Sequence, residues 1–546
     1  MTGPKLTSAI EPICAPRPLE IPRPEEAAAP AQSAMAATAF PAATEAARRV
    51  LRDGGNAVDA AVAAAWMLGV CEPSGSGLGG QATMLVCSPD GRCVVLDGHS
   101  HGPASLSRKL VSRAEQRAGF RAATVPSLPA VLGAAVTRFG RLPLSTTIAP
   151  AAEMADRGVT VTRLLRRHIQ WCREALAATP ATARIFLPEG RPPATGTVLR
   201  QPELSRTLRR IAAHGVDDFY RGGLSREIAA DMERHGGLIT AADLNGLRLP
   251  VFREAISTTY RGHEVISAPA PGGGLQVLLG LNLLEAIFPD SGPDSSPASY
   301  EMLARIIQAV FRERARWPID PQRLTESLQR WLLSAERAQE IAAEVKGPLP
   351  PALGRSAEGP GDTTHLCVAD RDGLVVSLTQ SIQSLFGAKV MNEQLGFLYN
   401  NYLCTCPRYR HPAQLRANAL PQSNAAPTIV FARGNRRVPR LVLGAAGSRR
   451  ITSSILQVIV NHIDRGMSVR PAVDSPRIHA TLAGHVAVER QLLGVRLEEV
   501  LRSRFRTVTV KAFRSYSMGA VQALAKGAGG WQGAADPRRE GTADGC

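Results

Sequence analysis

The 546-residue sequence lacks the marks of several protein classes. Aromatic residues make up only 5% of it. Its longest apolar runs are broken by Gly or Pro before they reach the roughly 20 residues of a membrane-spanning helix, so we expect no membrane span. An apolar content of 44% beside 20% charged residues is enough for a large core, which excludes a chain disordered throughout.

The basic residues do not form a nucleic-acid-binding pattern. Lys and Arg number 64 against 47 Asp and Glu, a formal net charge of +17. Such an excess is typical of proteins that bind polyanions. Here, however, the basic residues are scattered, nearly all are arginines, and no basic block is interleaved with aromatics. We therefore expect no nucleic-acid partner.

The cysteines do not form a metal-binding pattern. The nine cysteines are an odd number, and no CxxC pair occurs. Cys404 and Cys406 form an isolated CxC near His411, short of the four ligands of a zinc site. The N-terminal residues include no apolar segment of the kind found in secretory signals. The sequence predicts no metal, free thiols in a reducing compartment, and a cytoplasmic location.

The first part of the chain is rich in helix patterns. Residues 1–31 are rich in Pro and Ala, and we expect them to be disordered. Helical spacing follows over residues 37–70, interrupted at Asp53-Gly54-Gly55, with Asn56 as the cap of a second, wholly apolar helix. Further predicted helices span residues 164–177, 201–214, 223–235 and 300–317. Predicted strands span residues 82–87, 93–96 and 262–267.

The pattern changes near Thr363. Residues 346–362 are rich in Pro and Gly and predict an exposed loop or linker. Two predicted strands then flank Asp370-Arg371-Asp372-Gly373, a good hairpin signal. Strands at 428–431 and 440–443 and a helix at 452–464 follow. The chain thus divides into a helix-rich part over residues 32–362 and a strand-rich part over residues 363–546.

Thr363 could become a nucleophile if the Asp362–Thr363 bond were cut. The new α-amino group would have a pKa near 7.7–8.0, suited to removing the proton of the threonine's own hydroxyl. The same hydroxyl could make the cut by attacking the preceding carbonyl. Ser381, on the strand after the hairpin, could hydrogen-bond the Thr363 hydroxyl. The turn containing Gly447 and Ser448 could direct backbone N–H groups at an oxyanion.

Together these residues resemble the γ-glutamyltransferase family of N-terminal-nucleophile hydrolases. The most specific match is Gly361-Asp362-Thr363-Thr364-His365 with Leu378-Thr379-Gln380-Ser381. Other matching stretches, in family order, are residues 54–63, 72–80, 236–244, 386–387, 427–429, 456–461, 474–477 and 533–538. The resemblance covers roughly residues 33 to 545, and jointly the stretches are highly specific.

The resemblance implies an α+β fold, a four-layer αββα sandwich, made as a proenzyme. Self-cleavage between Asp362 and Thr363 would give two intertwined subunits, residues 1–362 and 363–546. By family position Thr363 is the nucleophile and Ser381 its hydroxyl partner. Gly447 and Ser448 occupy the two oxyanion positions, where the family has two glycines. No cofactor is implied.

The substrate positions depart from the family pattern. The family's arginine for the α-carboxylate is replaced by His99, and its asparagine by Gln383. The residues expected to bind the α-ammonium are Tyr402 and Thr405, neither of which is an acid. The family's Ser-Ser pair is Ser423-Asn424. Each lost charge contact costs about 2–5 kcal/mol in a desolvated pocket, so glutamyl recognition is expected to be largely lost.

The sequence leaves three alternative functions open. The first is an active N-terminal-threonine amidohydrolase that forms an acyl-enzyme on a non-glutamyl or modified amide or peptide-like small molecule. This includes a role in secondary metabolism or in C–C bond hydrolysis. The second is γ-glutamyl transfer and glutathione hydrolysis by a rearranged pocket. The third is an inactive binding protein that keeps the fold, which an uncleaved, well-folded chain would favour.

Other acidic and basic residues near these motifs are interpreted as structural. His365 is adjacent to Thr363, but the terminal amine already supplies the base. Asp59 and Glu72 belong to a buried-helix motif and the loop after it. His99 and His101 are the exception: they could bind a substrate carboxylate or be ordinary polar loop residues, and the sequence favours neither.

Overall fold

The computed structural model describes residues 32–248, 250–317, 325–349, 351, 353, 361–408 and 414–546. The predicted disordered tail, most of the predicted loop before Asp362, and His411 lie outside the described residues. Among those that are described, no helix is both long and apolar enough to cross a membrane.

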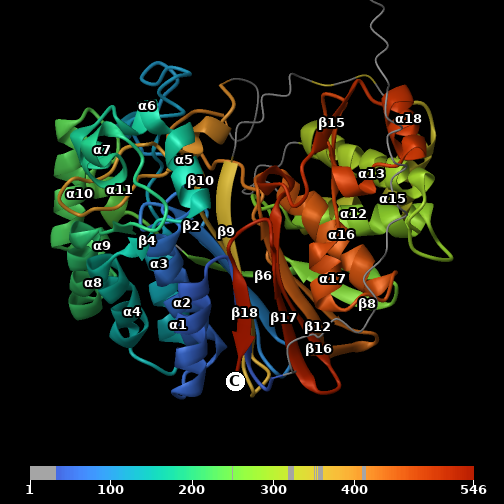
Figure 1. Cartoon of the computed structure of the whole chain (residues 1–546), viewed down its shortest axis with the longest axis horizontal. Coiled ribbons are helices and arrows are strands. Elements are labelled where there is room, and N and C mark those ends of the chain that lie inside the picture. The colour runs from blue at the N-terminus through green and yellow to red at the C-terminus, as the bar shows by residue number, and fades with distance from the viewer. Residues whose placement is uncertain are drawn as a thin grey trace, which may run out of the picture.

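Two antiparallel sheets face each other and a layer of helices covers the outer side of each (Figure 1). One sheet has the order β18-β1-β9-β10-β2-β3-β6 and the other β17-β16-β12-β11-β8-β7. Apolar residues from both sheets, including Leu85, Ile429 and Leu524, form the core between them. The fold is the four-layer αββα sandwich that the sequence resemblance implies.

Both sheets combine strands from before and after Thr363. The first sheet contains β1 (Met35–Thr38), β2 (Gln81–Cys87), β3 (Cys93–Asp97), β6 (Val251–Glu254), β9 (Gly361–Ala369), β10 (Val375–Ser384) and β18 (Thr542–Gly545). The second contains β7 (Ile256–Tyr260), β8 (His263–Ser267), β11 (Thr428–Ala432), β12 (Asn435–Ala446), β16 (Ala520–Gly527) and β17 (Gly530–Ala535). Smaller sheets pair β4 (Val159–Thr160) with β5 (Val198–Leu199), and β13 (Ile478–Ala480) with β14 (His485–Glu489) and β15 (Thr507–Lys511).

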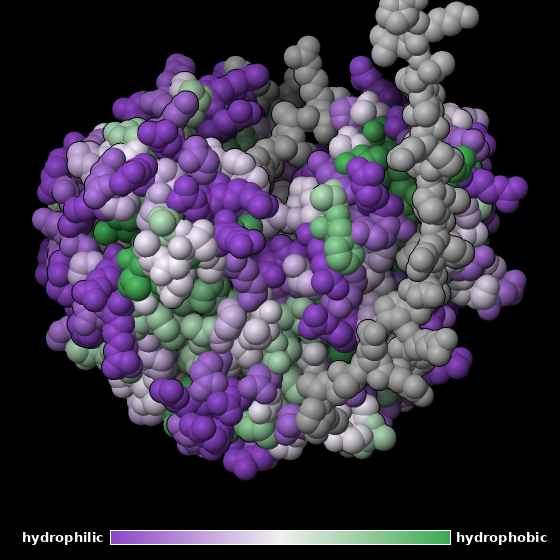
Figure 2. Space-filling view, in the orientation of Figure 1, coloured by the Kyte–Doolittle hydropathy of each residue, from purple (hydrophilic) through white to green (hydrophobic). Residues whose placement is uncertain are grey.

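The two helical layers cover separate cores. The first layer comprises α1 (Pro41–Arg52), α2 (Ala57–Cys71), α3 (Leu128–Phe139), α4 (Leu144–Arg157), α5 (Arg163–Trp171), α6 (Arg173–Leu176), α7 (Pro180–Phe186), α8 (Pro202–His214), α9 (Asp217–Arg221), α10 (Gly223–Arg234) and α11 (Ala241–Asn245). The second comprises α12 (Gly274–Ile287), α13 (Pro297–Arg316), α14 (Glu326–Leu332), α15 (Ala335–Lys346), α16 (Arg450–Ile463), α17 (Val469–Asp474) and α18 (Val495–Arg504). Hydrophilic residues spread across the face shown in Figure 2, and apolar ones form only small patches.

Helix α2 is buried along its whole length, as its apolar composition predicts. Its first turn is closed by a reciprocal capping box. The Asn56 side chain accepts from the backbone N–H groups of Val58 and Asp59, and the Asp59 carboxylate accepts from the backbone of Asn56. The predicted cap at Asn56 is confirmed, and Asp59 has a structural role.

Three local expectations were wrong. Residues 37–38, predicted as the start of a helix, belong to strand β1, because β1 inserts between β18 and β9. The predicted helix 164–177 is divided at Cys172 into α5 and α6. Cys87 and Cys93 are joined in a disulfide, since they are direct partners across the β2–β3 hairpin. The expectation of free thiols therefore fails for this pair.

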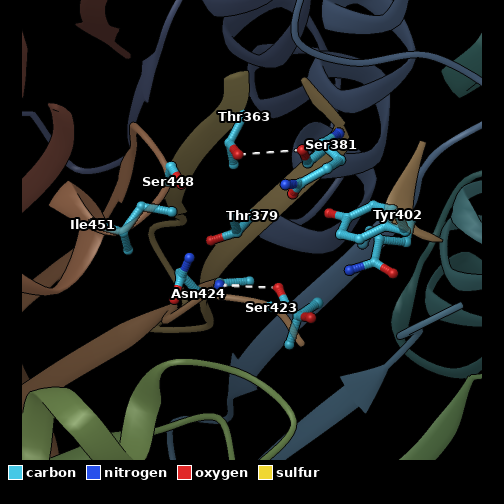
Figure 3. Close-up of a pocket in the computed structure, with 13 residues that line it drawn as sticks. Thr363, Thr379, Ser381, Tyr402, Ser423, Asn424, Ser448 and Ile451 are labelled. Carbon is cyan, nitrogen blue, oxygen red and sulfur yellow. Dashed lines mark hydrogen bonds between the residues drawn. The ribbon is translucent and has the colours of Figure 1, made fainter. Parts of the chain in front are cut away.

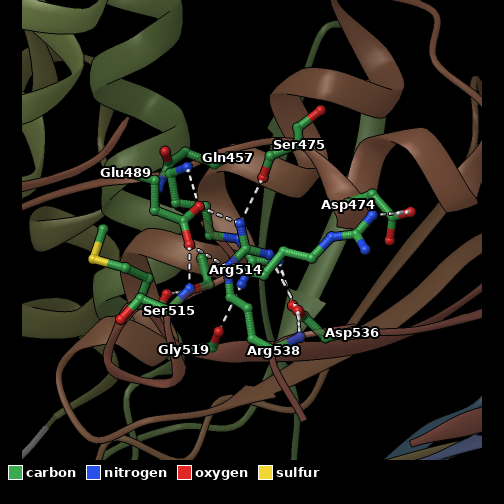
Figure 4. Close-up of polar contacts among 12 residues, drawn as sticks. Gln457, Asp474, Ser475, Glu489, Arg514, Ser515, Gly519, Asp536 and Arg538 are labelled. Atoms are coloured by element: carbon green, nitrogen blue, oxygen red, sulfur yellow. Dashed lines mark hydrogen bonds and ion pairs between the residues drawn. The ribbon is translucent and has the colours of Figure 1, made fainter. Parts of the chain in front are cut away.

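A buried ionic network fixes the segment that follows β17 (Figure 4). Arg538 donates to Glu489 and, at 3.1 Å, to Asp536. Arg477 donates to the other oxygen of Asp536 at 2.6 Å. Burial opposes ionisation of Asp536, but the two guanidiniums hold its pKa below the usual value. The network places Arg539, the next residue, against the start of β9.

We predict that Arg538→Met lowers the free energy of unfolding by about 3–5 kcal/mol, because it leaves two buried carboxylates without their shared partner. Urea unfolding followed by circular dichroism measures the change. Arg502→Met is the control, since its ion pair with Glu498 is exposed and is worth under about 1 kcal/mol. Equal effects of the two substitutions would contradict the prediction.

Candidate active site

A pocket at one end of the two sheets contains most of the predicted site residues (Figure 3). Its lining residues are Gln81, Ala82, Thr83, Thr363, Thr379, Ser381, Gln383, Tyr402, Ser423, Asn424, Ala425, Ser448 and Ile451. Of these, Gln81, Ala82, Thr83, Thr379, Ala425 and Ile451 were not expected from the sequence as site residues.

Thr363 and Ser381 face each other from neighbouring strands. Thr363 is the third residue of β9, and its hydroxyl lies 3.2 Å from that of Ser381 on β10. The β9–β10 register shifts between Gln380 and Gln383, which is a bulge at Ser381. Bulges re-aim side chains, and here the backbone N–H of Gln383 donates to the Ser381 hydroxyl at 2.8 Å.

Both hydroxyls also contact the peptide bond before Thr363. The carbonyl oxygen of Asp362 accepts from Thr363 Oγ1 at 2.8 Å and from Ser381 Oγ at 2.8 Å. A carbonyl that accepts two hydrogen bonds is polarised towards nucleophilic attack, and the Thr363 hydroxyl belongs to the residue on the other side of this peptide bond. This arrangement can support an N-to-O acyl shift.

The side chain of Asp362 lies in a separate, fully buried polar site. Its carboxylate accepts from Arg539, from Ser74 at 3.1 Å, and from the Thr363 backbone N–H at 2.9 Å. Burial opposes ionisation of Asp362, but Arg539 and His168 hold its pKa below the usual value. The carboxylate therefore stays charged and fixes the residue on the acyl side of the bond.

Arg539 also donates from Nη1 to a second carboxylate, Glu72 Oε1, at 3.4 Å. Glu72 also accepts from the hydroxyl of Thr364 at 2.5 Å. Burial raises the pKa of Glu72 from 4.5 to about 7, and the neighbouring Asp362 adds to the shift. Glu72, interpreted from the sequence as structural, thus lies beside the candidate site. The sequence could not reveal this contact, because Arg539 is 467 residues away.

The two predicted oxyanion residues form a tight turn before α16. Gly447 has φ 121° and Ser448 has φ 58°. A Cβ at residue 447 would lie 2.8 Å from the Cα of Gly519, so only glycine fits there. The backbone of Ser448 adopts the left-handed conformation although the residue carries a side chain. Ser448 lines the pocket, whereas Gly447 is not among the lining residues.

The predicted substrate residues divide into two groups. Gln383, Tyr402, Ser423 and Asn424 line the pocket. The lining residues do not include Thr405, whose hydroxyl donates to the Tyr402 carbonyl at 3.0 Å.

His99 also lies outside the lining. It is buried, with its Nδ1 2.5 Å from Asp97 Oδ1, and Asp97 in turn pairs with Arg253 at 2.9 Å. Burial opposes ionisation of Asp97, yet His99 and Arg253 lower the pKa of its carboxyl to about 2.

His365 lies two residues after the nucleophile on β9 and does not line the pocket. Its ring contacts the hydroxyl of Thr379 at 2.9 Å and packs where a side chain at residue 444 would otherwise lie. Burial lowers the pKa of His365 to about 3, so the ring is neutral. These contacts agree with its interpretation as structural. Among the residues that the structure describes, no group of acidic, His and Cys side chains could hold a metal ion.

The sequence model of gamma-glutamyltranspeptidase matches residues 43–546. The chain belongs to the γ-glutamyltranspeptidase family. Its relatives include both acylases and glutathione hydrolases. It is 35% identical over 466 residues to the acylase ACY 1 proenzyme of Pseudomonas sp. strain SE83, covering 80% of this chain and 81% of the relative.

Two further relatives extend the match over most of both chains. The glutathione hydrolase proenzyme of Escherichia coli K12 is 31% identical over 526 residues, covering 91% of this chain and 89% of the relative. The crystal structure of cephalosporin acylase from Bacillus halodurans superposes with a TM-score of 0.87 at 28% identity, covering 98% and 99%. The chain is thus an N-terminal-nucleophile hydrolase by family and by fold.

We predict that the Thr363→Ala chain loses stability as the pH rises from about 4.5 to about 7. The raised pKa of Glu72 means that the folded protein favours the protonated acid. The stability that protonated Glu72 contributes is complete below pH 4.5, the pKa of the unfolded carboxyl. It declines as the pH rises above that value and is lost once the pH passes about 7, a change of up to about 3 kcal/mol.

Thermal unfolding midpoints across this pH range test the prediction. Adding Glu72→Gln is expected to flatten the decline, because the amide cannot ionise. An unchanged pH dependence in the double variant would show that other groups cause it.

Proposed function

We propose that the chain is a self-processing N-terminal-threonine amidohydrolase that acts through an acyl-enzyme on a non-glutamyl acyl group. The observation that carries this proposal is the position of the Thr363 hydroxyl, 2.8 Å from the carbonyl oxygen of the residue before it. The proenzyme names of two relatives support a precursor that is cut.

Self-cleavage would proceed in two steps. Thr363 Oγ1 attacks the carbonyl carbon of Asp362, the C–N bond breaks, and the nitrogen takes the proton lost by the hydroxyl and becomes the α-amine. Water then hydrolyses the ester, which gives a new backbone α-carboxylate on Asp362 and frees the threonine hydroxyl. Ser381 donates to the carbonyl oxygen throughout, and Arg539 holds the acyl side through the Asp362 side chain.

Substrate turnover would reuse the same hydroxyl. The neutral α-amine of Thr363 takes the hydroxyl proton as the oxygen attacks the substrate carbonyl. Backbone N–H groups at Gly447 and Ser448 would stabilise the oxyanion, aided by the positive end of α16. The leaving amine takes the proton, and water or a second amine resolves the acyl-enzyme.

We predict that wild-type protein separates on a denaturing gel into fragments of about 39 and 20 kDa, from a total of 58.1 kDa. Thr363→Ala is expected to remain whole and inactive, since no hydroxyl is present to attack. Ser381→Ala is expected to cleave about 10–100-fold more slowly, because one hydrogen bond to the carbonyl is lost. A wild-type chain that stays whole and folded would instead favour a binding protein.

The lining of the pocket favours a substrate whose acyl group carries no α-ammonium. The residues that line it include no Asp or Glu, so a glutamyl ammonium would have no carboxylate partner among the described lining residues. The acylase relatives support amide hydrolysis as the reaction, in preference to C–C bond hydrolysis. Glutathione hydrolysis and γ-glutamyl transfer are the alternative, favoured by the relatives named glutathione hydrolase.

We predict that glutaryl-p-nitroanilide is hydrolysed with at least about tenfold higher kcat/KM than γ-glutamyl-p-nitroanilide. The two acyl groups differ only in the α-ammonium, whose unpaired burial costs at least about 1.4 kcal/mol. Initial rates of nitroaniline release at several concentrations give both values. Equal or better turnover of the glutamyl compound would support the alternative.

The compartment stays a prediction. The sequence suggests the cytoplasm, whereas the Cys87–Cys93 disulfide is of the kind that persists in oxidising compartments.

A further inference from the structure

A second cavity lies outside the catalytic pocket, in the first helical layer. Its volume is about 340 Å³, within the roughly 300–1,000 Å³ that is typical of small-molecule sites. It is enclosed by residues 115–121, by α6 and the turn after it, by the end of α10, and by the segment that follows β10 (Figure 1). Its lining residues are Glu115, Ala118, Gly119, Phe120, Arg121, Ala175, Ala178, Thr179, His235, Ala388, Lys389 and Val390. None of them lines the pocket at Thr363.

Most of the lining is small and apolar. It includes four alanines, Val390 and Phe120. The Phe120 ring is fixed by its neighbours, because it stacks on His235 with the ring centroids 4.3 Å apart and meets Tyr399 edge-on at 5.8 Å. The cavity therefore suits the apolar body of a small molecule.

Three of the four charged or titratable side chains on the lining already have partners. The Glu115 carboxylate accepts from Arg121 at 3.4 Å. Arg121 also donates to two backbone carbonyls, at 2.9 Å each. His235 Nδ1 lies 2.9 Å from the backbone carbonyl of Asp231. The fourth side chain, Lys389, differs from these three.

Lys389 has no carboxylate partner among the residues that the structure describes. Its Nζ donates to the backbone carbonyl of Gly387 at 2.7 Å, which leaves two N–H groups for a ligand. Two thiols act on it, Cys172 and Cys404, and burial raises the pKa of each, so both are neutral. Burial lowers the pKa of Lys389 itself, as expected for an ammonium without a compensating negative charge.

We propose that this cavity is a second binding site, for a small monocarboxylate with an apolar body. The carboxylate accepts from Lys389 Nζ, and the apolar body lies against the alanines and Phe120. The ligand supplies the negative charge that Lys389 lacks among its described neighbours. A monoanion fits better than a phosphate dianion, because Glu115 on the same lining repels the second charge. This inference goes beyond the proposed function and does not depend on it.

Benzoate, benzyl alcohol and benzylamine test the proposal, because they share one ring and differ in charge. We expect isothermal titration calorimetry to show benzoate binding to wild-type protein at least about tenfold more tightly than benzyl alcohol, with benzylamine the weakest. Lys389→Met should weaken benzoate binding at least about tenfold, and Lys389→Arg should keep most of it. Both variants place a long, unbranched side chain at this residue, whose φ is 59°, so the backbone strain is matched.

A second variant tests the cavity and leaves the charge in place. Ala178 is exposed at the rim, so Ala178→Phe is expected to fold and to fill the space, and it should also weaken benzoate binding. Lys526→Met is the matched control, since it removes a lysine that lies over the Trp531 ring and should leave benzoate binding unchanged. Absence of benzoate binding in the wild-type protein, or its survival in both Lys389→Met and Ala178→Phe, would overturn the proposal.

A chemical measurement locates the ligand. The chain has only six lysines, so limited acetylation with N-hydroxysuccinimide acetate and peptide mass spectrometry can follow each one. Bound benzoate is expected to slow acetylation of Lys389 at least about tenfold, because it covers the amine and raises its pKa, and to leave Lys526 unaffected. Equal slowing at both lysines, or none at Lys389, would place benzoate elsewhere and overturn the proposal. Both measurements can be repeated on Thr363→Ala, so failure of the proposed function can be recognised separately.

Discussion

The site depends on how the peptide bond between Asp362 and Thr363 is held. Two hydroxyls bind its carbonyl oxygen, and a buried ion pair to Arg539 holds the side chain on its acyl side. Arg539 can be there because the adjacent Arg538 is fixed by Glu489 and Asp536. The end of the chain and the start of β9 thus stabilise each other, and the hydroxyl and carbonyl are aligned before any chemistry occurs.

Cleavage and recognition make different electrostatic demands. The groups around Asp362 are charged, buried and mutually compensated, which suits a contact that must be rigid. The pocket in front of Thr363 is lined by uncharged side chains. A pocket of this kind can change its substrate through a few polar substitutions without disturbing the nucleophile, which is consistent with a family that includes both acylases and glutathione hydrolases.

The sequence predicted those parts of the molecule that depend on local patterns. The β9–β10 hairpin, the Asn56 cap and the facing of Thr363 and Ser381 follow from turn residues, a capping signal and a motif of fixed spacing. The rest depends on contacts distant in sequence. Strand β1 is short and Ala-rich, so only its two neighbouring strands reveal it, and Arg539 meets Asp362 from 177 residues away.

The mixing of strands in both sheets has a consequence for a chain cut before Thr363. Each fragment would supply strands to both sheets, so neither could leave without breaking the ladders on both sides of the core. Once separated, the fragments would have to meet by diffusion, and recovery would depend on protein concentration in a way that folding of the intact chain does not. The cut protein would then persist through slow unfolding instead of reversible refolding. Thermal unfolding of the cleaved enzyme would therefore be irreversible.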